Sequence, residues 1–497
     1  MRGDNRNSIL PDFITLMRSR SIIIIALFAA ACSTRKDVLA PTPVGAVPSE
    51  SQLAWHEMET NAFVHFTTNT FTDKEWGYGD ESPQIFNPTG FDPTQWITTL
   101  KEAGFKGVIL TCKHHDGFCL WPSQYTEHSV KHSPFQEGKG DVVKAVADAC
   151  RAAGLKFGVY LSPWDRNRAD YGTPEYITYY RNQLKELFTA YGPVFEMWFD
   201  GANGGDGYYG GAKEKRKIDG ARYYDWPSTL SMVREMEPGV LFFSDAGPGV
   251  RWVGNERGLA GETNWNTITP DTLYAGQPDI TDLLNQGHED GTAWIPAEVD
   301  VSIRPGWFYH AKEDSLVKSP QQLFEIYLTS VGRGSTLLLN VPPDRRGRFH
   351  ENDVASLKGY KALLDKEFKT NHAAKASCSA SNERGDLQNF EAGLLTDGNP
   401  ETYWATDDDI TTASVEVAFS GSKSVKYVVL QEYVKLGQRV KAYNVEAFSN
   451  GAWHSLTSGT TIGYKRILRV DPTEAGKVRV NITASKACPL LSNLEVY

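Results

Sequence analysis

Polar and aromatic side chains follow directly after several short apolar runs of this sequence, which is where enzymes built on parallel strands carry their chemistry. The run 194–200 is strongly apolar, ends in Asp200 and is followed by Gly201. A carboxylate at the end of such a strand, among aromatic neighbours that exclude water, suits the nucleophile of a retaining glycosidase. An Asp before a Gly also commonly caps a turn, so these residues alone leave both roles of Asp200 open.

Histidines accompany two other runs of this kind. His65 lies within 62–67, and His114 and His115 follow 107–113. Paired histidines can bind a metal, but no spaced His/Asp set completes a coordination shell here, so hydrogen bonds to sugar hydroxyls are the better-supported role. Because adjacent residues on a strand point to opposite faces, we expect one of the pair to face a pocket and the other to pack outside it or in the loop. A plain core position stays open for His65.

The spacing of these segments predicts the frame that holds them. From about residue 55 to 345, short β-branched or aromatic runs alternate with helical periodicity, as in a parallel sheet with crossover helices. This favours an α/β fold of the (β/α)8 barrel type over an open doubly wound sheet, and no glycine-rich phosphate loop indicates the latter. The predicted strands are 62–67, 107–113, 157–162, 194–200, 240–245, 294–301 and 335–341, and the predicted helices are 92–103, 141–153, 174–191, 227–236, 320–331 and 352–369.

A change of periodicity near residue 373 predicts a second domain. The sequence beyond it alternates in the manner of strands and is broken by turn residues, which is typical of an antiparallel β-sandwich or jelly roll. Its predicted strands include 414–419, 425–430, 443–448 and 477–482. The predicted organisation is a leader at 1–32, a linker at 33–50, a catalytic barrel at 51–372 and a sandwich at 373–497.

The N-terminus predicts export. Arg18 and Arg20 precede the apolar run 22–28, which leads into small residues ending in Cys32. This is typical of a signal peptide, and the run is too short for a stable membrane span. The small residues before Cys32 resemble a bacterial lipobox, which implies a lipid anchor on that cysteine as the only membrane contact. We therefore expect an exported bacterial protein, periplasmic or at the outer membrane, with 33–50 as a tether outside the fold.

Composition excludes some classes of partner and site. The formal net charge of -10 comes without a basic block, which argues against nucleic acid. Beyond Cys32, the remaining cysteines are odd in number and lack CxxC spacing, so neither a zinc site nor a disulfide framework is indicated. A disulfide between Cys378 and Cys488 is nevertheless possible, because the first and last strands of a sandwich often run side by side.

Taken together, the barrel segments resemble the family 29 glycoside hydrolases, the retaining α-L-fucosidases. The matching residues are 63–66 with Glu75 and Trp76, then 113–118, 160–162 and 198–201. The resemblance implies that Asp200 is the nucleophile and that no cofactor takes part in the chemistry. The substrate-binding residues that it implies are His65, Glu75, Trp76, His114, His115, Tyr160 and Trp198.

Three carboxyl groups are candidates for the general acid and base. The segments 244–248 and 251–256 resemble the subfamily acting on α-1,3 and α-1,4 branches, which implies Glu256 for this role. A flanking Trp supports it, since apolar surroundings raise a carboxyl pKa towards the range of a general acid. Glu262 and Asp245 are the rivals, and Glu196, four positions before Asp200, is expected in the core.

The implied function is hydrolysis of terminal fucose from fucosylated oligosaccharides or glycoconjugates by double displacement. Two alternatives stay open: a surface glycan-binding lipoprotein with a non-catalytic barrel, and a retaining exo-glycosidase for another sugar. Several features are left without a role. The Gly/Tyr-rich stretch 204–211 and the charged 213–217 could shape the aglycone side or be solvated, Trp307 and Tyr309 could stack a sugar or pack, and Glu298 is an unassigned strand-end carboxyl group.

In the C-terminal domain, the segment 394–404 resembles discoidin-like and carbohydrate-binding family 32 sandwiches. That resemblance implies a structural Ca²⁺, a cation that needs several oxygen ligands. The implied ligands are Asp397, Asn399, Thr402 and Glu495. A calcium-free turn capped by Asp397 is the alternative.

Overall fold

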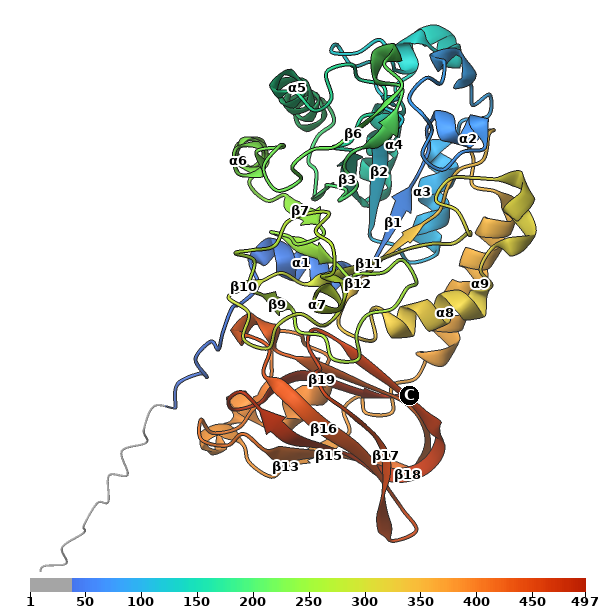
Figure 1. Ribbon diagram of the computed structural model, residues 1–497. Coiled ribbons are helices and arrows are strands. Elements are labelled where there is room, and N and C mark those ends of the chain that lie inside the picture. The colour runs from blue at the N-terminus through green and yellow to red at the C-terminus, as the bar shows by residue number, and fades with distance from the viewer. Residues whose placement is uncertain (1–37) are drawn as a thin grey trace, which may run out of the picture. The chain divides into compact units, whose positions relative to one another are not determined.

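Parallel strands close into an eight-stranded barrel in the computed structural model, which describes residues 38–497 (Figure 1). Their order around the barrel is β1-β12-β11-β8-β7-β4-β3-β2. The predicted barrel is therefore confirmed. The strands are β1 (Thr60–Val64), β2 (Gly107–Lys113), β3 (Lys156–Leu161), β4 (Glu196–Trp198), β7 (Leu241–Ser244), β8 (Val250–Trp252), β11 (Ala297–Ser302) and β12 (Thr336–Asn340).

Strand β8 was absent from the sequence prediction. It is three residues long and carries Arg251 at its centre, so it has no apolar run to identify it. The Arg251 side chain is buried and donates to the backbone oxygens of Leu284 and Trp265. These bonds satisfy a guanidinium that would otherwise be costly to bury.

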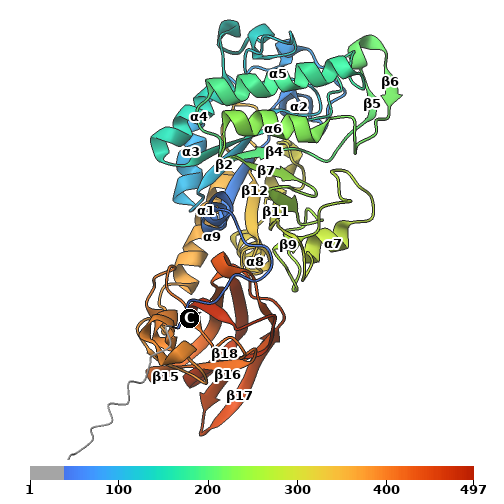
Figure 2. The ribbon, with the colours of Figure 1, turned by 90° about the vertical axis from the view of Figure 1, so that its left-hand side faces the viewer.

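The six predicted helices all form, with ends within two residues of those expected. They are α3 (Pro93–Glu102), α4 (Val142–Ala153), α5 (Pro174–Ala190), α6 (Trp226–Met236), α8 (Pro320–Thr329) and α9 (Glu351–Glu367), joined by α1 (Glu50–Met58), α2 (Thr68–Thr72) and α7 (Thr281–Gln286). Asp92 and Asp141 accept from the Gln95 and Lys144 backbone N–H groups, which fixes the starts of α3 and α4. Several of these helices lie outside the barrel strands (Figure 2).

Alternation along each strand separates two layers of the barrel core. One set of side chains, including Phe63, Trp198 and Phe243, fills the barrel interior. The intervening set, including Val64 and Met197, packs outward with the helices. Residues that continue the inward-facing set past the carboxyl ends of the strands are thereby directed towards one mouth of the barrel.

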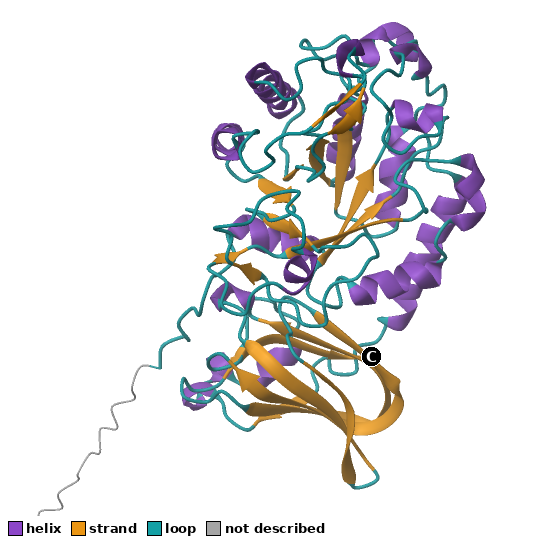
Figure 3. Cartoon of the chain, viewed as in Figure 1, coloured by secondary structure: helices purple, strands orange, loops and turns teal. Residues whose placement is uncertain are grey.

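The C-terminal domain is built mainly of strands (Figure 3), and its pairings are antiparallel, which confirms the predicted sandwich. The order is β14-β19-β15-β18-β16-β17, with β13 beside β15. The predicted strands 414–419 and 425–430 are two parts of one long strand with a register shift between them. The strands are β13 (Ser377–Ala380), β14 (Trp404–Ala405), β15 (Ala413–Glu432), β16 (Val440–Ser449), β17 (Ala452–Gly459), β18 (Arg466–Ser485) and β19 (Leu490–Val496).

Cys378 and Cys488 are both free thiols, so the possible disulfide does not form in this structure. Cys378 lies on β13, which pairs with residues 415–418 of β15. Cys488 directly precedes β19, which pairs with residues 428–432 at the other end of β15. The first and last strands thus lie beside the same strand but at opposite ends of it.

Part of the predicted linker packs on the sandwich instead of lying outside the fold. Val44 N donates to Leu436 O at 3.1 Å, and the Arg439 guanidinium donates to Thr42 O at 2.7 Å. The predicted signal peptide and Cys32 lie outside the described residues. Within residues 38–497, no helix is long and apolar enough to cross a membrane.

Candidate functional site

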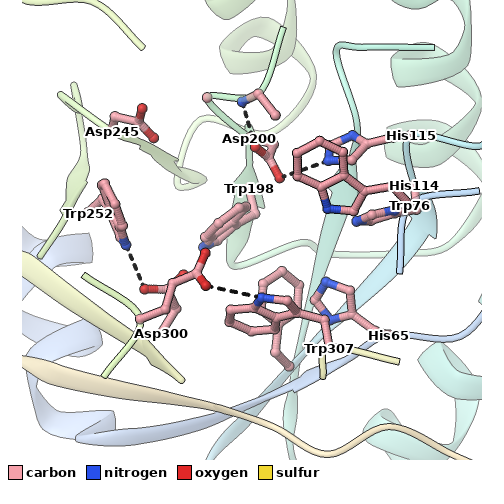
Figure 4. A pocket seen from close by; sticks show the side chains of 14 residues that line it. His65, Trp76, His114, His115, Trp198, Asp200, Asp245, Trp252, Asp300 and Trp307 are labelled. Carbon is pink, nitrogen blue, oxygen red and sulfur yellow. Dashed lines mark hydrogen bonds and ion pairs between the residues drawn. The ribbon is translucent and has the colours of Figure 1, made fainter. Parts of the chain in front are cut away.

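A pocket of about 220 Å³ opens at the carboxyl ends of the barrel strands (Figure 4). Its size suits one sugar ring with its hydroxyl groups. Phe63 and Trp198 belong both to the interior core and to the pocket lining, so they form its floor. The lining residues are Phe63, His65, Trp76, His114, His115, Trp198, Asp200, Gly201, Ala202, Asp245, Trp252, Glu256, Asp300 and Trp307.

Asp200 is held by both carboxylate oxygens. Its Oδ1 accepts from Ala202 N at 2.7 Å, which caps the turn after β4. Its Oδ2 accepts from the Tyr160 hydroxyl at 2.9 Å and lies 3.8 Å from His115 Nε2. Burial and the Asp200 charge raise the pKa of Tyr160 well above its ordinary value, so this hydroxyl stays a donor. One oxygen therefore fixes the turn and the other is oriented towards the pocket.

His65 presents a hydrogen-bond acceptor to the pocket. Its Nδ1 lies 2.8 Å from Asn340 Oδ1, while Asn340 Nδ2 donates to Ser302 Oγ and Trp307 O. The Asn340 oxygen must therefore accept, and His65 Nδ1 carries the proton. Burial lowers the pKa of His65 to about 3, so the ring is neutral and Nε2 accepts.

The hydrogen bonds of His115 fix its tautomer in the same way. Ser162 Oγ donates to Trp164 O at 2.6 Å, so it accepts from His115 Nδ1 at 2.7 Å. Burial lowers the pKa of His115, although the Asp200 charge opposes this shift. The neutral ring then offers Nε2 as an acceptor beside Asp200. Two such acceptors and a carboxylate suit a ligand rich in hydroxyl donors.

The prediction that only one of His114 and His115 faces the pocket is wrong. Both rings line it, with centroids 4.1 Å apart. The reason is that β2 ends at Lys113, so both histidines lie in the following turn, where strand alternation does not apply. Burial lowers the pKa of His114 well below its ordinary value, which keeps this ring neutral too.

Two of the three candidate acid/base residues reach the pocket. Glu256 lies at the rim, where its Oε2 accepts from Trp307 Nε1 at 3.3 Å. Asp245 lines the pocket with its Oδ2 accepting from Gly276 N at 2.7 Å. Glu262 does not reach it: its side chain is 86% exposed beside Arg333 and lines another hollow.

The pKa values of the two candidate acid/base residues that line the pocket, Glu256 and Asp245, are both raised. Desolvation raises the pKa of Glu256, with the charges of Asp200 and Glu75 adding to the shift and the Trp307 bond opposing it. Burial raises the pKa of Asp245 to about 6. A raised pKa favours the protonated form that a general acid needs.

Asp300 is a pocket residue that the sequence reasoning missed. It is buried, accepts from Trp252 Nε1 at 2.8 Å and has a pKa raised well above its ordinary value by burial and then by Glu256. The pattern 297–302 alternates small or apolar residues with Glu298, Asp300 and Ser302, which places these polar groups on the inward face of β11. That alternation could have identified Asp300 alongside Glu298.

Glu75 does not line the pocket but supports a loop that does. Its carboxylate accepts from Trp307 N at 2.8 Å and lies 2.5 Å from His310 Nε2, whose Nδ1 lies 2.6 Å from Asp73. Burial opposes a charge on His310, but the hydrogen bonds with Asp73 and Glu75 outweigh it and raise its pKa. The neighbouring Trp76 does line the pocket and is 51% exposed, so it is available to a larger ligand.

The Gly/Tyr-rich stretch forms a hairpin of β5 (Gly205–Gly207) and β6 (Glu214–Arg216). Within it, Tyr209 is buried and its hydroxyl accepts from Trp164 Nε1 at 2.9 Å. This stretch is therefore packed on the barrel mouth, although it contributes no residue to the pocket lining. Trp307 lines the pocket, whereas the Tyr309 hydroxyl donates to Asp314.

The predicted calcium ligands do not converge on one point. Asp397 Oδ1 accepts from Asn399 N at 2.7 Å and its Oδ2 accepts from the Thr402 hydroxyl at 2.8 Å, so the turn is closed by its own bonds. Glu495 accepts from the Tyr497 hydroxyl and lines a different hollow with Glu59. Across residues 38–497, no cluster of three or more His, Cys, Asp or Glu side chains is placed to hold a metal ion. Calcium binding stays a prediction from the resemblance.

Comparison with known proteins identifies the family. The model of the alpha-L-fucosidase family matches residues 43–367. The chain belongs to the α-L-fucosidase family, glycoside hydrolase family 29. Residues 375–494 match the F5/8 type C domain, which agrees with the sandwich. Alpha-L-fucosidase 1 of Arabidopsis thaliana is 40% identical over 462 residues, covering 92% of this chain and 88% of that protein.

Solved structures agree with this assignment over nearly the whole chain. A glycoside hydrolase 29 family member from an unknown rumen bacterium is 44% identical, with a TM-score of 0.83 and coverage of 92% of this chain and 78% of that one. A Ruminococcus gnavus GH29 fucosidase in complex with fucose is 33% identical, with a TM-score of 0.83 and coverage of 93% and 97%. The protein is thus a glycoside hydrolase with α-L-fucosidase relatives across both domains.

Proposed function

We propose that this α-L-fucosidase releases terminal fucose with retention of configuration, using Asp200 as nucleophile and Glu256 as acid and base. The observation that carries the proposal is the convergence of these two carboxyl groups on one sugar-sized pocket in different states. Asp200 is fixed by donors on both oxygens, whereas the pKa of Glu256 is raised. An acid and a nucleophile require environments that shift the pKa values of the two carboxyl groups apart.

In the first step, Asp200 Oδ2 attacks the anomeric carbon as the bond to the leaving oxygen breaks. Glu256 gives its proton to that oxygen, and a fucosyl ester forms on Asp200. In the second step, Glu256 takes a proton from water, whose oxygen attacks the anomeric carbon and breaks the ester. Fucose leaves with its original configuration, and Glu256 is protonated again.

Glu256 suits the acid role better than Asp245 because of where the two lie. Glu256 stands at the solvent-exposed rim, where a leaving sugar must depart. The Asp245 carboxylate is packed against Gly201, where an added Cβ would lie 2.1 Å from its Oδ2, and is tied to Gly276 N. It is thus held beside the turn that carries the nucleophile.

We infer further that the substrates are fucosylated glycans with α-1,3 or α-1,4 branches. The subfamily resemblance at 244–256 supports this linkage, and the half-exposed Trp76 offers an apolar face beyond the pocket for a second sugar. Export and a lipid anchor at Cys32 complete the proposal. A Cys32→Ala variant that still carries radiolabelled palmitate in cells would contradict the anchor.

The decisive experiment incubates the enzyme with a Lewis trisaccharide and measures released fucose for the parent, Asp200→Ala and Glu256→Ala, with Glu262→Ala as a matched control. We expect loss of release in the first two variants, rescue of Glu256→Ala by azide, and full activity in the control. Full activity without Glu256 would move the acid role to Asp245. A folded parent that binds the glycan but releases no fucose would refute the proposed reaction.

A further inference from the structure

Beneath the pocket floor, two carboxyl groups are enclosed in the barrel. Glu196 on β4 and Glu298 on β11 are both 0% exposed. Trp55 Nε1 donates to Glu196 Oε2 at 3.1 Å, and Trp198 Nε1 donates to Glu298 Oε1 at 2.9 Å. Each carboxyl group therefore has one oxygen occupied by an indole N–H. Neither group takes part in the proposed reaction.

The remaining oxygen of each carboxyl group has no hydrogen-bond donor among residues 38–497. Glu196 Oε1 and Glu298 Oε2 are buried and accept no N–H or O–H from any other described residue. Glu196 and Glu298 lie close enough for each to act on the charge of the other. Two neighbouring carboxylates cannot both be ionised in a dry interior, so the pair retains a proton.

The environment keeps that proton in place at neutral pH. Burial raises the pKa of Glu196 to about 8, and burial together with the neighbouring Glu196 raises that of Glu298 well above its ordinary value. Both carboxyl groups therefore have a raised pKa, and the pair holds one proton at neutral pH. The Trp198 indole N–H donates to Glu298 whichever of the two acids carries that proton.

Trp198 transmits this arrangement to the sugar pocket. Its ring stacks on Phe243 with centroids 3.9 Å apart and planes 6° apart. The same side chain lines the pocket. Glu196 and Trp198 lie on the inward face of β4, and Asp200 continues this alternation past the end of the strand. The bond from the indole N–H to Glu298 fixes the direction in which the ring points, and with it the floor on which a sugar lies.

We propose that Glu298 is a positioning residue that holds the Trp198 indole, and with it the pocket floor, by sharing one proton with Glu196. The inference rests on the proposed function in one respect, that the pocket receives the fucosyl ring. It gives a role to Glu298, the strand-end carboxyl group to which the sequence analysis assigned none. It also accounts for two buried acids that form no ion pair with a Lys or Arg among residues 38–497.

The test compares Glu298→Gln with Glu298→Leu, using KM for an aryl α-L-fucoside and calorimetric binding of L-fucose. Gln offers an oxygen to Trp198 and an N–H to Glu196, so we expect KM within about threefold of the parent. Leu removes both bonds and leaves a buried indole N–H unpaired, so we expect KM and the fucose Kd to rise together by about tenfold or more, with kcat changing less. Glu432→Leu is the matched control, because Glu432 is a buried acid in the sandwich, held by backbone N–H groups.

A folded Glu298→Leu with parental KM and fucose Kd would overturn the inference. If that variant does not fold, the pH profile of Glu298→Gln decides. In the parent, loss of the shared proton at alkaline pH should raise KM, and Glu298→Gln should lack this rise because its N–H cannot be lost. An identical alkaline rise in both proteins would overturn the inference. A parent that binds fucose but cleaves no fucoside would instead refute the proposed function, and the binding comparison would still test Glu298.

Discussion

Tyr160→Phe isolates the bond that orients the nucleophile. The substitution removes one hydroxyl from a ring that is 0% exposed, so the change leaves packing of the ring unaltered. A hydrogen bond to a charged group contributes about 1.5 to 3 kcal/mol, equivalent to about 10- to 150-fold in a rate ratio. The Asp200 side chain is 23% exposed, so water can replace part of the lost bond. We therefore expect the lower part of this range, about 10- to 30-fold in kcat/KM.

The assay is kcat/KM for an aryl α-L-fucoside, with Tyr180→Phe as the matched control. Tyr180 is also buried, but its hydroxyl donates to Leu161 O at 2.7 Å, away from the pocket. The control should lose about 1 kcal/mol of stability, seen as a lower Tm, and keep kcat/KM within about twofold. If Tyr160→Phe has parental kcat/KM while remaining folded, the Tyr160 bond does not orient Asp200 for catalysis.

Three further predictions concern His310, the acid/base residue and the Asp397 turn of the C-terminal domain. The stability that charged His310 contributes is full below pH 6.5 and is lost as the pH rises through the raised pKa of His310. The Tm of the parent should therefore exceed that of His310→Gln by less as the pH rises. A Tm difference that stays constant with pH would contradict this prediction. Glu262→Gln should keep parental kcat/KM, whereas Glu256→Gln should lose at least about a hundredfold on a natural glycan, and equal losses would contradict the assignment. Measuring Tm before and after chelation of calcium decides between the two interpretations of the Asp397 turn. A turn closed by its own hydrogen bonds predicts a Tm change under about 1 °C. A calcium site predicts a clear fall in Tm, which Asp397→Ala abolishes.

The sequence predicted the elements that carry long, regular patterns. The barrel helices were found because Asp caps and apolar periodicity mark them, as at Asp92 and Asp141. Strand β8 was missed because its buried central residue is Arg251, whose charge is satisfied only by distant backbone oxygens. Such long-range compensation leaves no local trace in the sequence.

The site was predicted less completely than the fold. Asp200 and the pocket histidines were found because they end apolar runs, but the orientation of His114 and His115 depends on where β2 stops. Glu75 was expected to contact sugar, yet its carboxylate is bound to the loop of Trp307, which follows β11, two places from β1 around the barrel. Asp300 was missed because a polar residue in mid-strand is ambiguous until the inward face is known.

The most direct test of the central claim is to trap the covalent intermediate. The enzyme is incubated with a 2-deoxy-2-fluoro-fucosyl substrate carrying a good leaving group, digested, and analysed by tandem mass spectrometry. We predict one added fluorofucosyl group, in ester linkage to Asp200. An adduct on Asp245 or another carboxyl group, or rapid turnover with inversion and no adduct, would contradict the assignment of Asp200 as nucleophile.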